Sequence, residues 1–353
     1  MSPLSRRRFL RQAPALGFAQ SSARRDPNAS LRIGCLNVFS YSHLNGLWAP
    51  LFHLTGMRIT HCWDIEPDKA EAFAKTYACA AVRNFDDMLG KVDAVVSGGY
   101  YNYPWNHILH QPYLEAGLPN LINRPFANSL AKAKRLLDLA RKHNAPLLVP
   151  SAHEHNEAIA RARAWARGKK ILCYTATNSF DDYPTHGVHG VYLVCRAVAE
   201  AGHPVVSVAY QAKNWHSPPG LLTFEHSNFL GALHQVSGSW GTIHIHTAED
   251  YGGRDFLIRS GTGYPYDKTE VWAPTLWTFE HMARQGEMPQ SPDQILHKTQ
   301  VFLAGFRSIL TNDGKPVRLD QVPEDWESPV DLPNHPGDQT AALFRKKFGK
   351  QGP

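Results

Sequence analysis

The chain has 353 residues, of which 43% are hydrophobic and 19% charged, a composition typical of a globular protein with room for two ordinary domains. Its net charge of +6 arises within residues 1–25, which hold six arginines and no acid, so subtracting those six charges leaves zero for the remainder. A body without excess positive charge argues against a nucleic-acid partner. No apolar run is long enough to cross a bilayer, so we expect no membrane span.

The arginine-rich start resembles an export signal. The heptapeptide Ser5-Arg6-Arg7-Arg8-Phe9-Leu10-Arg11 is similar to the twin-arginine motif, and the apolar stretch 13–19 and the small residues 21–23 follow it. We therefore interpret residues 1–30 as a twin-arginine leader and linker, which places the mature protein in the periplasm or otherwise outside the cytoplasm. The alternative is a disordered basic N-terminus on a cytoplasmic protein.

Residues 31–150 alternate between strand-like and helix-like segments joined by short links. This order predicts a Rossmann-like, doubly wound parallel sheet, and thus an α/β fold for the first domain. The expected strands are 31–37, 58–64, 92–97, 118–122 and 146–149. The expected helices are 47–54, 67–77, 105–116 and 130–143.

The pattern changes after residue 150. Residues 151–330 predict an α+β domain with a largely antiparallel sheet, and residues 331–353 a polar tail. The expected helices are 157–166, 189–201 and 291–310, and the expected strands are 171–179, 205–213, 232–239 and 242–248. We expect this domain to bind the substrate and to carry any contact between copies of the chain.

The first turn of the Rossmann-like domain is unusual, because its glycine positions fall on Asn37, Phe39 and Ser42. Asn37 tolerates a positive φ angle and can make the sharp turn. Ser42 is small enough to pack closely and can hydrogen-bond a phosphate. A side chain as large as Phe39 must either block the approach of the phosphate or swing outward.

Asp64 ends the second predicted strand, about 22 residues beyond Ser42, close to the spacing expected of a ribose-binding acid. An acid there favours NAD over NADP, because it repels a 2′-phosphate. The competing interpretation is a residue that caps the helix beginning near Pro67.

Several segments together resemble the Gfo/Idh/MocA family, named for glucose–fructose oxidoreductase and inositol dehydrogenase. The similarity extends over about residues 31–322 and rests on segments in matching order. These are Arg32-Ile33-Gly34, Trp63-Asp64-Ile65-Glu66-Pro67, Leu114-Glu115-Ala116-Gly117, Leu121-Ile122-Asn123-Arg124-Pro125, Gly187-Val188-His189 and Asn312-Asp313-Gly314-Lys315-Pro316-Val317.

The resemblance implies NAD or NADP binding and oxidation or reduction of sugars or cyclitols. The family's histidine corresponds to His189, whereas its lysine is replaced by Arg124 and its aspartate by Thr185. A guanidinium stays charged and cannot relay a proton, but it can orient a substrate oxygen. Histidine is suited to acid–base work near neutral pH. The alternatives are a buried structural His189 and a solvated or ion-paired Arg124.

Histidines recur near the expected site. His153 and His155 follow the last Rossmann strand, and His186 precedes His189 by three residues. With Thr185, these are our candidate substrate-binding residues. His43 in the first turn, Tyr101 after the third strand and Asn123 beside Arg124 are further candidate cofactor-binding residues.

The same histidines leave metal binding open. The His153–His155 and His186–His189 pairs could hold zinc or manganese, or could bind sugar hydroxyls, and we assign no metal ligands. His244 and His246 share one face of a strand.

The leading interpretation is an exported NAD(P)-dependent oxidoreductase that transfers a hydride to or from a small carbohydrate. One alternative is a non-redox lyase or isomerase on sugars, with or without a metal. Another is an inactive carbohydrate-binding relative. The family further implies a homo-oligomer formed through the sheet of the second domain.

Overall fold

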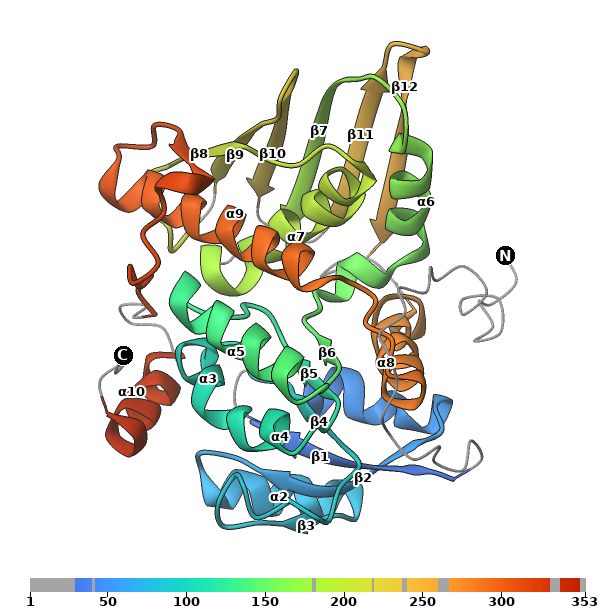
Figure 1. The fold of residues 1–353 in the computed structure, drawn as a ribbon, viewed down its shortest axis with the longest axis vertical. Coiled ribbons are helices and arrows are strands. Elements are labelled where there is room, and N and C mark those ends of the chain that lie inside the picture. The colour runs from blue at the N-terminus through green and yellow to red at the C-terminus, as the bar shows by residue number, and fades with distance from the viewer. Residues whose placement is uncertain are drawn as a thin grey trace. The chain divides into compact units, whose positions relative to one another are not determined.

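The computed structural model describes residues 29–39, 42–179, 182–217, 219–236, 240–259, 267–330 and 337–349 (Figure 1). The chain divides into two compact units. Domain 1 combines the residues up to Pro150 with Trp272–Pro292 and the segment from Pro329, and domain 2 combines Ser151–Val271 with Asp293–Ser328. The expected domain 2 was one continuous span, 151–330. Residues 1–28 of the proposed leader lie outside the described residues.

Domain 1 is built on a six-stranded sheet in the order β3-β2-β1-β4-β5-β6, with every neighbouring pair parallel. Its strands are short and apolar, and β1 and β4 are almost wholly buried, as a sheet covered on both faces requires. The predicted doubly wound parallel sheet is confirmed. The strands are β1 (Leu31–Leu36), β2 (Met57–Trp63), β3 (Ala80–Ala81), β4 (Ala94–Ser97), β5 (Asn120–Ile122) and β6 (Leu147–Leu148).

Helices flank this sheet, and some differ from the expected ones. α8, for which no helix was expected, contributes residues 272–285 to domain 1. The expected helix 105–116 divides into the 3₁₀ turn η3 and the short helices α3 and α4. The bounds are α2 (Pro67–Tyr77), η3 (Tyr103–Trp105), α3 (Asn106–Leu109), α4 (Gln111–Glu115), α5 (Leu130–Lys142) and α8 (Lys268–Gln285).

The segment after the first turn also differs from the prediction. In place of a regular helix over 47–54, the chain forms a π turn, η1 (Leu44–Trp48), and a 3₁₀ helix, η2 (Ala49–Leu54). Asn45 and Gly46 have non-helical dihedral angles, and Pro50 lacks an N–H for an α-helical bond. The first turn of domain 1 therefore does not lead into a continuous α-helix.

The chain's last described residues form a helix, α10 (Gly337–Phe348), where we expected a polar tail. Phe344 is fully buried and stacks on Trp105, with ring centroids 5.3 Å apart. Its ring also meets the edge of Trp63. The polar residues of the segment lie on one side of an amphipathic helix, and its apolar side completes the core of domain 1.

Domain 2 contains a seven-stranded sheet in the order β12-β11-β7-β10-β9-β8-β13. Only the central pair, β7 and β10, is parallel, so the expected largely antiparallel sheet is confirmed. The strands are β7 (Ile171–Ser179), β8 (Ser207–Ala212), β9 (Gly220–Glu225), β10 (Leu230–Val236), β11 (Trp240–Thr247), β12 (Asp250–Arg259) and β13 (Val317–Arg318).

One face of this sheet packs against helices, and its burial pattern alternates accordingly. The opposite face exposes Leu230, Val236 and Leu257, whose exposed fractions are 62%, 38% and 41%. The helical elements are η4 (Ala152–His155), α6 (Glu157–Ala166), η5 (Tyr183–Gly187), α7 (Val188–Ala197), η6 (Ala199–Ala201), α9 (Pro292–Thr311) and η7 (Leu319–Gln321).

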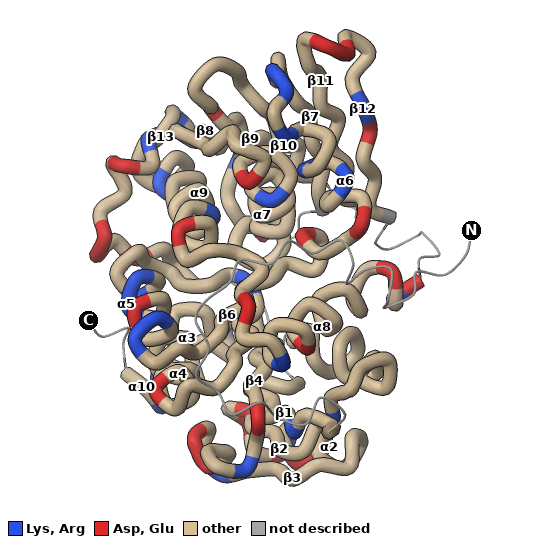
Figure 2. The backbone as a smooth tube through the Cα atoms, turned by 45° about the vertical axis from the view of Figure 1, so that its right-hand side comes forward, with Lys and Arg blue, Asp and Glu red and all other residues tan. Residues whose placement is uncertain are grey.

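Basic and acidic residues are interspersed along the described parts of both domains (Figure 2). In the ranges that the structure covers, no helix is both long and apolar enough to cross a bilayer.

Candidate active site

Asn37 makes the turn that follows β1. Its φ angle is +51°, as predicted for an asparagine standing in for the first glycine, and its N–H donates to the carbonyl of Trp63 at 2.9 Å. The side chain is only 4% exposed, and neither Oδ1 nor Nδ2 has a hydrogen-bond partner among the described residues. A buried amide without hydrogen-bond partners lowers the stability of the fold. A polar ligand group that hydrogen-bonds to this amide would therefore gain binding free energy.

Phe39 directs its side chain outward, because the residue is 40% exposed. Its backbone N–H faces inward and donates to Oδ2 of Asp64 at 3.1 Å. Of the two outcomes expected for a large residue at this position, the structure has the outward-facing side chain. Residues 40 and 41 lie outside the described residues.

Asp64 is 3% exposed and ties two segments together. Oδ2 accepts from Phe39, and Oδ1 accepts from the N–H of Glu66 at 3.1 Å, just before α2. Burial raises the pKa of this carboxyl to about 6, although the hydrogen bonds from Phe39 and Glu66 oppose the change. The predicted contact with ribose stays a prediction, while the contact with Glu66 supports an additional structural role.

Ser42 packs closely, as expected. It bridges to Gly99, and its Oγ accepts from the N–H of Leu44 at 3.1 Å. A Cβ added to Gly98 would collide with that Oγ, so the glycine permits the close approach.

Arg124 lies fully buried at the end of β5, which excludes the solvated alternative. Its Nη2 donates to Nε2 of His43 at 2.9 Å, and its guanidinium lies 4.7 Å from the ring centroid of Tyr100. The His43 ring also contacts Trp48 and Trp272. The two predicted residues Arg124 and His43 therefore meet, in an aromatic cluster that sequence reasoning missed.

Two other predicted cofactor residues have clear positions. Asn123 donates from Nδ2 to the carbonyl of Gly98 at 2.7 Å, which links the ends of β5 and β4. Tyr101 is 1% exposed, and its ring centroid lies 5.3 Å from that of Tyr100. Stacking of Tyr101 on a nicotinamide or a sugar stays a prediction.

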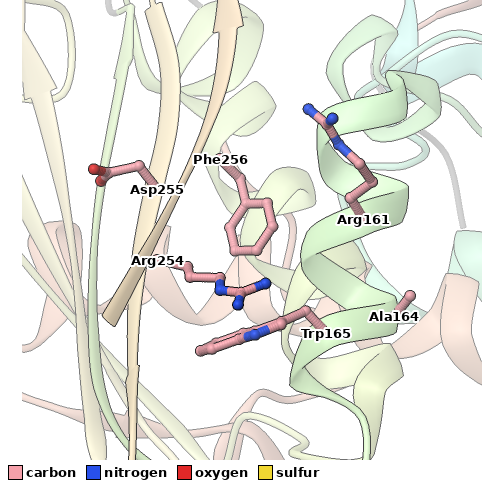
Figure 3. Close-up of a pocket in the computed structure, with 6 residues that line it drawn as sticks. All are labelled: Arg161, Ala164, Trp165, Arg254, Asp255 and Phe256. Carbon is pink, nitrogen blue, oxygen red and sulfur yellow. The ribbon is translucent and has the colours of Figure 1, made fainter. Parts of the chain in front are cut away.

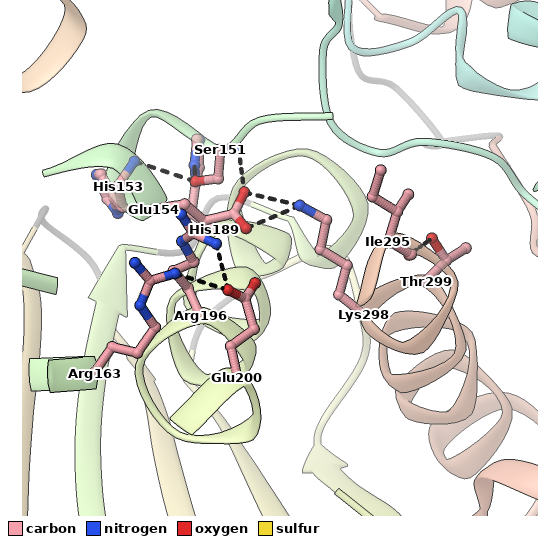
Figure 4. Close-up of polar contacts among 10 residues, drawn as sticks. All are labelled: Ser151, His153, Glu154, Arg163, His189, Arg196, Glu200, Ile295, Lys298 and Thr299. Carbon is pink, nitrogen blue, oxygen red and sulfur yellow. Dashed lines mark hydrogen bonds and ion pairs between the residues drawn. The ribbon is translucent and has the colours of Figure 1, made fainter. Parts of the chain in front are cut away.

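In domain 2, His189 stands in the first turn of α7 and joins Ser151, which the sequence analysis did not select. Nδ1 of His189 lies 2.6 Å from Oγ of Ser151, and its ring centroid lies 4.8 Å from that of His153 (Figure 4). Both histidines are less than 8% exposed. Two of the predicted residues are thus brought together around one serine hydroxyl.

Thr185 and His186 lie in η5, just before α7, and both contact Asp182. The Asp182 carboxylate accepts from the backbone N–H and the hydroxyl of Thr185, and its Oδ2 lies 3.4 Å from Nδ1 of His186. Burial alone would raise the pKa of Asp182, but the hydrogen bonds and charge of its neighbours lower it. Asp182 therefore orders the turn, and its position three residues before Thr185 is a capping pattern visible in the sequence.

His155 differs from its neighbour His153. Burial, together with the positive charges of Arg196, Lys298 and Arg163, lowers the pKa of His155 well below its usual range and keeps the ring neutral. On β11, the ring centroids of His244 and His246 lie 4.4 Å apart, and His244 pairs with Asp255 at 2.6 Å. Within the described ranges, no three His, Cys, Asp or Glu side chains are grouped to hold a metal ion.

A shallow pocket of about 520 Å³ lies between α6 and β12 of domain 2 (Figure 3). None of the predicted site residues lines it. Trp165 is its central aromatic residue, with the Arg254 guanidinium 5.5 Å from the ring centroid. Its lining residues are Arg161, Ala164, Trp165, Arg254, Asp255 and Phe256.

Comparison with known proteins places residues 33–151 within the model of a family described as "Oxidoreductase family, NAD-binding Rossmann fold" (GFO_IDH_MocA). Over 102 residues the chain is 35% identical to dTDP-3,4-didehydro-2,6-dideoxy-alpha-D-glucose 3-reductase of Streptomyces violaceoruber. That match spans 27% of this chain and 28% of the reductase.

Solved structures share the fold over most of the chain. A probable dehydrogenase from Thermotoga maritima has a TM-score of 0.67 at 14% identity, covering 83% of this chain and all of its own. Myo-inositol dehydrogenase from Lactobacillus casei, solved in complex with NAD(H) and myo-inositol, has a TM-score of 0.66 at 13% identity. That match covers 85% of this chain and 98% of the dehydrogenase.

Proposed function

We propose that this protein, whose residues 33–151 belong to the Gfo/Idh/MocA oxidoreductase family, is an NAD-dependent oxidoreductase acting on a sugar, a cyclitol or a related carbohydrate. The observation that carries the proposal is the turn after β1. Its left-handed Asn37 presents a buried amide without partners, beside a turn amide that Asp64 holds in place.

The residues of the turn fit a dinucleotide in part. The Asn37 amide can bind a phosphate or ribose oxygen, and Asp64 above its pKa offers an anionic acceptor to ribose hydroxyls. Asp64 also favours NAD over NADP, because it would repel a 2′-phosphate. The kinked η1 lacks the aligned N–H groups and dipole of a full helix N-terminus. We therefore expect the pyrophosphate to be held less firmly than in a glycine-rich turn.

We assign the substrate chemistry to His189 and Arg124. His189 exchanges a proton with the reacting hydroxyl or carbonyl, because an imidazole can do so in both directions near neutral pH. Arg124, held by His43 and Tyr100, stays charged and stabilises a developing negative charge on oxygen. Bound NAD would accept or return the hydride.

Titration calorimetry of the purified protein with NADH and NADPH tests the nucleotide site. The informative variant is Asn37→Gly, which keeps the positive φ angle but removes the amide. Asn144→Gly is the matched control, because Asn144 also has a φ of +51°. We expect NADH to bind more tightly than NADPH, and Asn37→Gly to weaken NADH binding by about tenfold, as loss of one hydrogen bond to a charged group does.

If neither nucleotide binds at millimolar concentration, the oxidoreductase proposal is wrong. If NADH binds, hydride transfer is screened spectrophotometrically with cyclitols and sugars. His189→Gln should then abolish most turnover while leaving NADH affinity within about twofold. Turnover retained in His189→Gln would reject the assigned proton carrier.

We further propose export through the twin-arginine route, on the strength of the segment Ser5–Arg11. The paired change Arg6→Lys and Arg7→Lys preserves charge but removes the twin arginines. Cell fractionation should find the parent protein in the periplasm and the double variant in the cytoplasm. Equal distribution of the two would favour a cytoplasmic protein with a basic N-terminus.

We also propose that the chain forms a homo-oligomer through the open face of the domain 2 sheet. The exposed Leu230, Val236 and Leu257 support this, because large apolar side chains gathered on one face mark interaction surfaces. Leu230→Lys should lower the molar mass measured by light scattering. A parent protein that is monomeric would reject the proposal.

A further inference from the structure

We propose that Ser151 is a positioning residue for His189: its hydroxyl holds Nδ1 of the imidazole and thereby fixes which ring nitrogen exchanges a proton with substrate. The inference rests on the proposed role of His189 in proton transfer. Ser151 thereby joins the candidate active site, although neither the sequence motifs nor the family comparison identifies it.

The contact itself is short and enclosed. Oγ of Ser151 and Nδ1 of His189 are 2.6 Å apart, Ser151 is 0% exposed and His189 is 7% exposed. The ring of His153 lies 4.8 Å away at an angle of 33° and packs on the imidazole from one side. The hydrogen bond therefore orients a ring that is buried and packed against His153.

Ser151 is in turn held by the start of η4. Its Oγ accepts from the N–H of His153 at 3.3 Å, and its own N–H donates to Oε2 of Glu154 at 2.6 Å. This reciprocal capping box fixes both the backbone and the side chain of the serine.

The capping box is anchored from α9 (Figure 4). Nζ of Lys298 donates to both carboxylate oxygens of Glu154, at 2.9 and 3.2 Å, and both side chains are at most 1% exposed. Burial raises the pKa of Glu154 and lowers that of Lys298, while the charge of each partner opposes the other's shift. A continuous polar path thus runs from Lys298 through Glu154 and Ser151 to His189.

A hydroxyl oxygen suits this role because it can accept a hydrogen bond from the ring in both protonation states. When His189 is neutral, its proton lies on Nδ1, which donates to Ser151 Oγ and leaves Nε2 unprotonated. When Nε2 takes up a proton and the ring becomes an imidazolium, the Nδ1–H donates to Ser151 Oγ. The same contact therefore persists in both protonation states, and Nε2 is assigned to the exchange with substrate.

The test compares Ser151→Ala, which removes the hydroxyl, with Ser151→Thr, which keeps it. We expect Ser151→Ala to lower kcat by about 10- to 100-fold with KM changed less than about threefold, since small misplacement of a reacting group costs up to ~10²-fold. Ser151→Thr should restore kcat to within about threefold of the parent. If Ser151→Ala does not fold, Ser151→Cys replaces it, because a thiol is only a weak hydrogen-bond partner.

A second readout is independent of turnover. The ring ¹⁵N signals of His189 in the ligand-free protein, assigned by their loss in His189→Gln, should move in Ser151→Ala and stay near the parent positions in Ser151→Thr. Unchanged kcat or unchanged ring signals in folded Ser151→Ala would overturn the proposal. If the parent shows no turnover, the proposed function fails, and the ring signals alone decide whether Ser151 controls the imidazole.

Discussion

Arg124 donates a hydrogen bond from Nη2 to Nε2 of His43, across 2.9 Å in the interior of domain 1. A guanidinium has no acceptor, so Nε2 must be the unprotonated nitrogen and the proton of a neutral His43 lies on Nδ1. The pair therefore holds one positive charge, on Arg124, and the ring of Tyr100 supports that charge at 4.7 Å.

The pair makes His43 important for stability. His43→Phe keeps an aromatic ring against Trp272 but removes the acceptor of Arg124, so we expect the free energy of unfolding to fall by about 1–3 kcal/mol. His43→Gln keeps an acceptor and should lose less. Urea denaturation measures both, with His53→Gln on the exposed side of η2 as the control. Equal stability of His43→Phe and the parent would show that Arg124 does not depend on this acceptor.

Asp64 predicts a pH dependence of stability. Its pKa in the folded protein is about 6, above the unfolded value of about 3.9, so the folded state binds the proton more tightly. Ionisation of Asp64 therefore costs stability, and its contribution falls as pH rises from about 4 to about 6 and is constant above that. The size of the loss is on the order of 1–3 kcal/mol.

Asp64→Asn removes this titration while keeping one carbonyl acceptor for the turn. Denaturation at pH 4.5, 6 and 7.5 should show a smaller decrease with pH in Asp64→Asn than in the parent protein. Asp68→Asn, an exposed change in the first turn of α2, should retain the parent's decrease. Parallel curves for Asp64→Asn and the parent would contradict the raised pKa.

Local chemistry explains why the Rossmann-like turn could be predicted from sequence. Asn37 follows a buried strand at the position of a glycine, and few other residues tolerate its φ of +51°. Asp64 likewise ends a strand at a fixed spacing. The parallel sheet itself follows from short apolar strands that alternate with helices.

Hydrogen bonds between residues distant in the sequence could not be predicted from local sequence patterns. Ser151 and His189 are 38 residues apart, and His43 and Arg124 are 81 apart, so only the tertiary fold brings each pair together.

The kink at Gly46 and the helix after residue 336 were missed for other reasons. In residues 44–54, Pro50 and the non-helical Asn45 and Gly46 interrupt the helical pattern. In residues 337–348, Ala341, Phe344 and Phe348 do recur with the helical period, but the prediction gave more weight to the many polar residues around them.

The buried pair of Glu154 and Lys298 should show strong coupling. Lys298→Met leaves the Glu154 carboxylate enclosed without its cation, which typically costs about 3–5 kcal/mol. Adding Glu154→Gln removes the charge and keeps an acceptor for the Ser151 N–H, so the double variant should be more stable than Lys298→Met. A double-mutant cycle by urea denaturation checks this. Strict additivity of the two changes would mean that the ion pair contributes no net coupling.

α10 should be required for the stability of domain 1. Phe344 is 0% exposed and contacts Trp105 and Trp63, so Phe344→Ala should lower the free energy of unfolding by about 3–5 kcal/mol through the cavity it leaves. Tryptophan emission should also shift to longer wavelength as water reaches the two indoles. Lys346→Ala, on the exposed side of the helix, is the control and should change stability by less than about 0.5 kcal/mol. If Phe344→Ala unfolds like the control, α10 does not complete the core in solution.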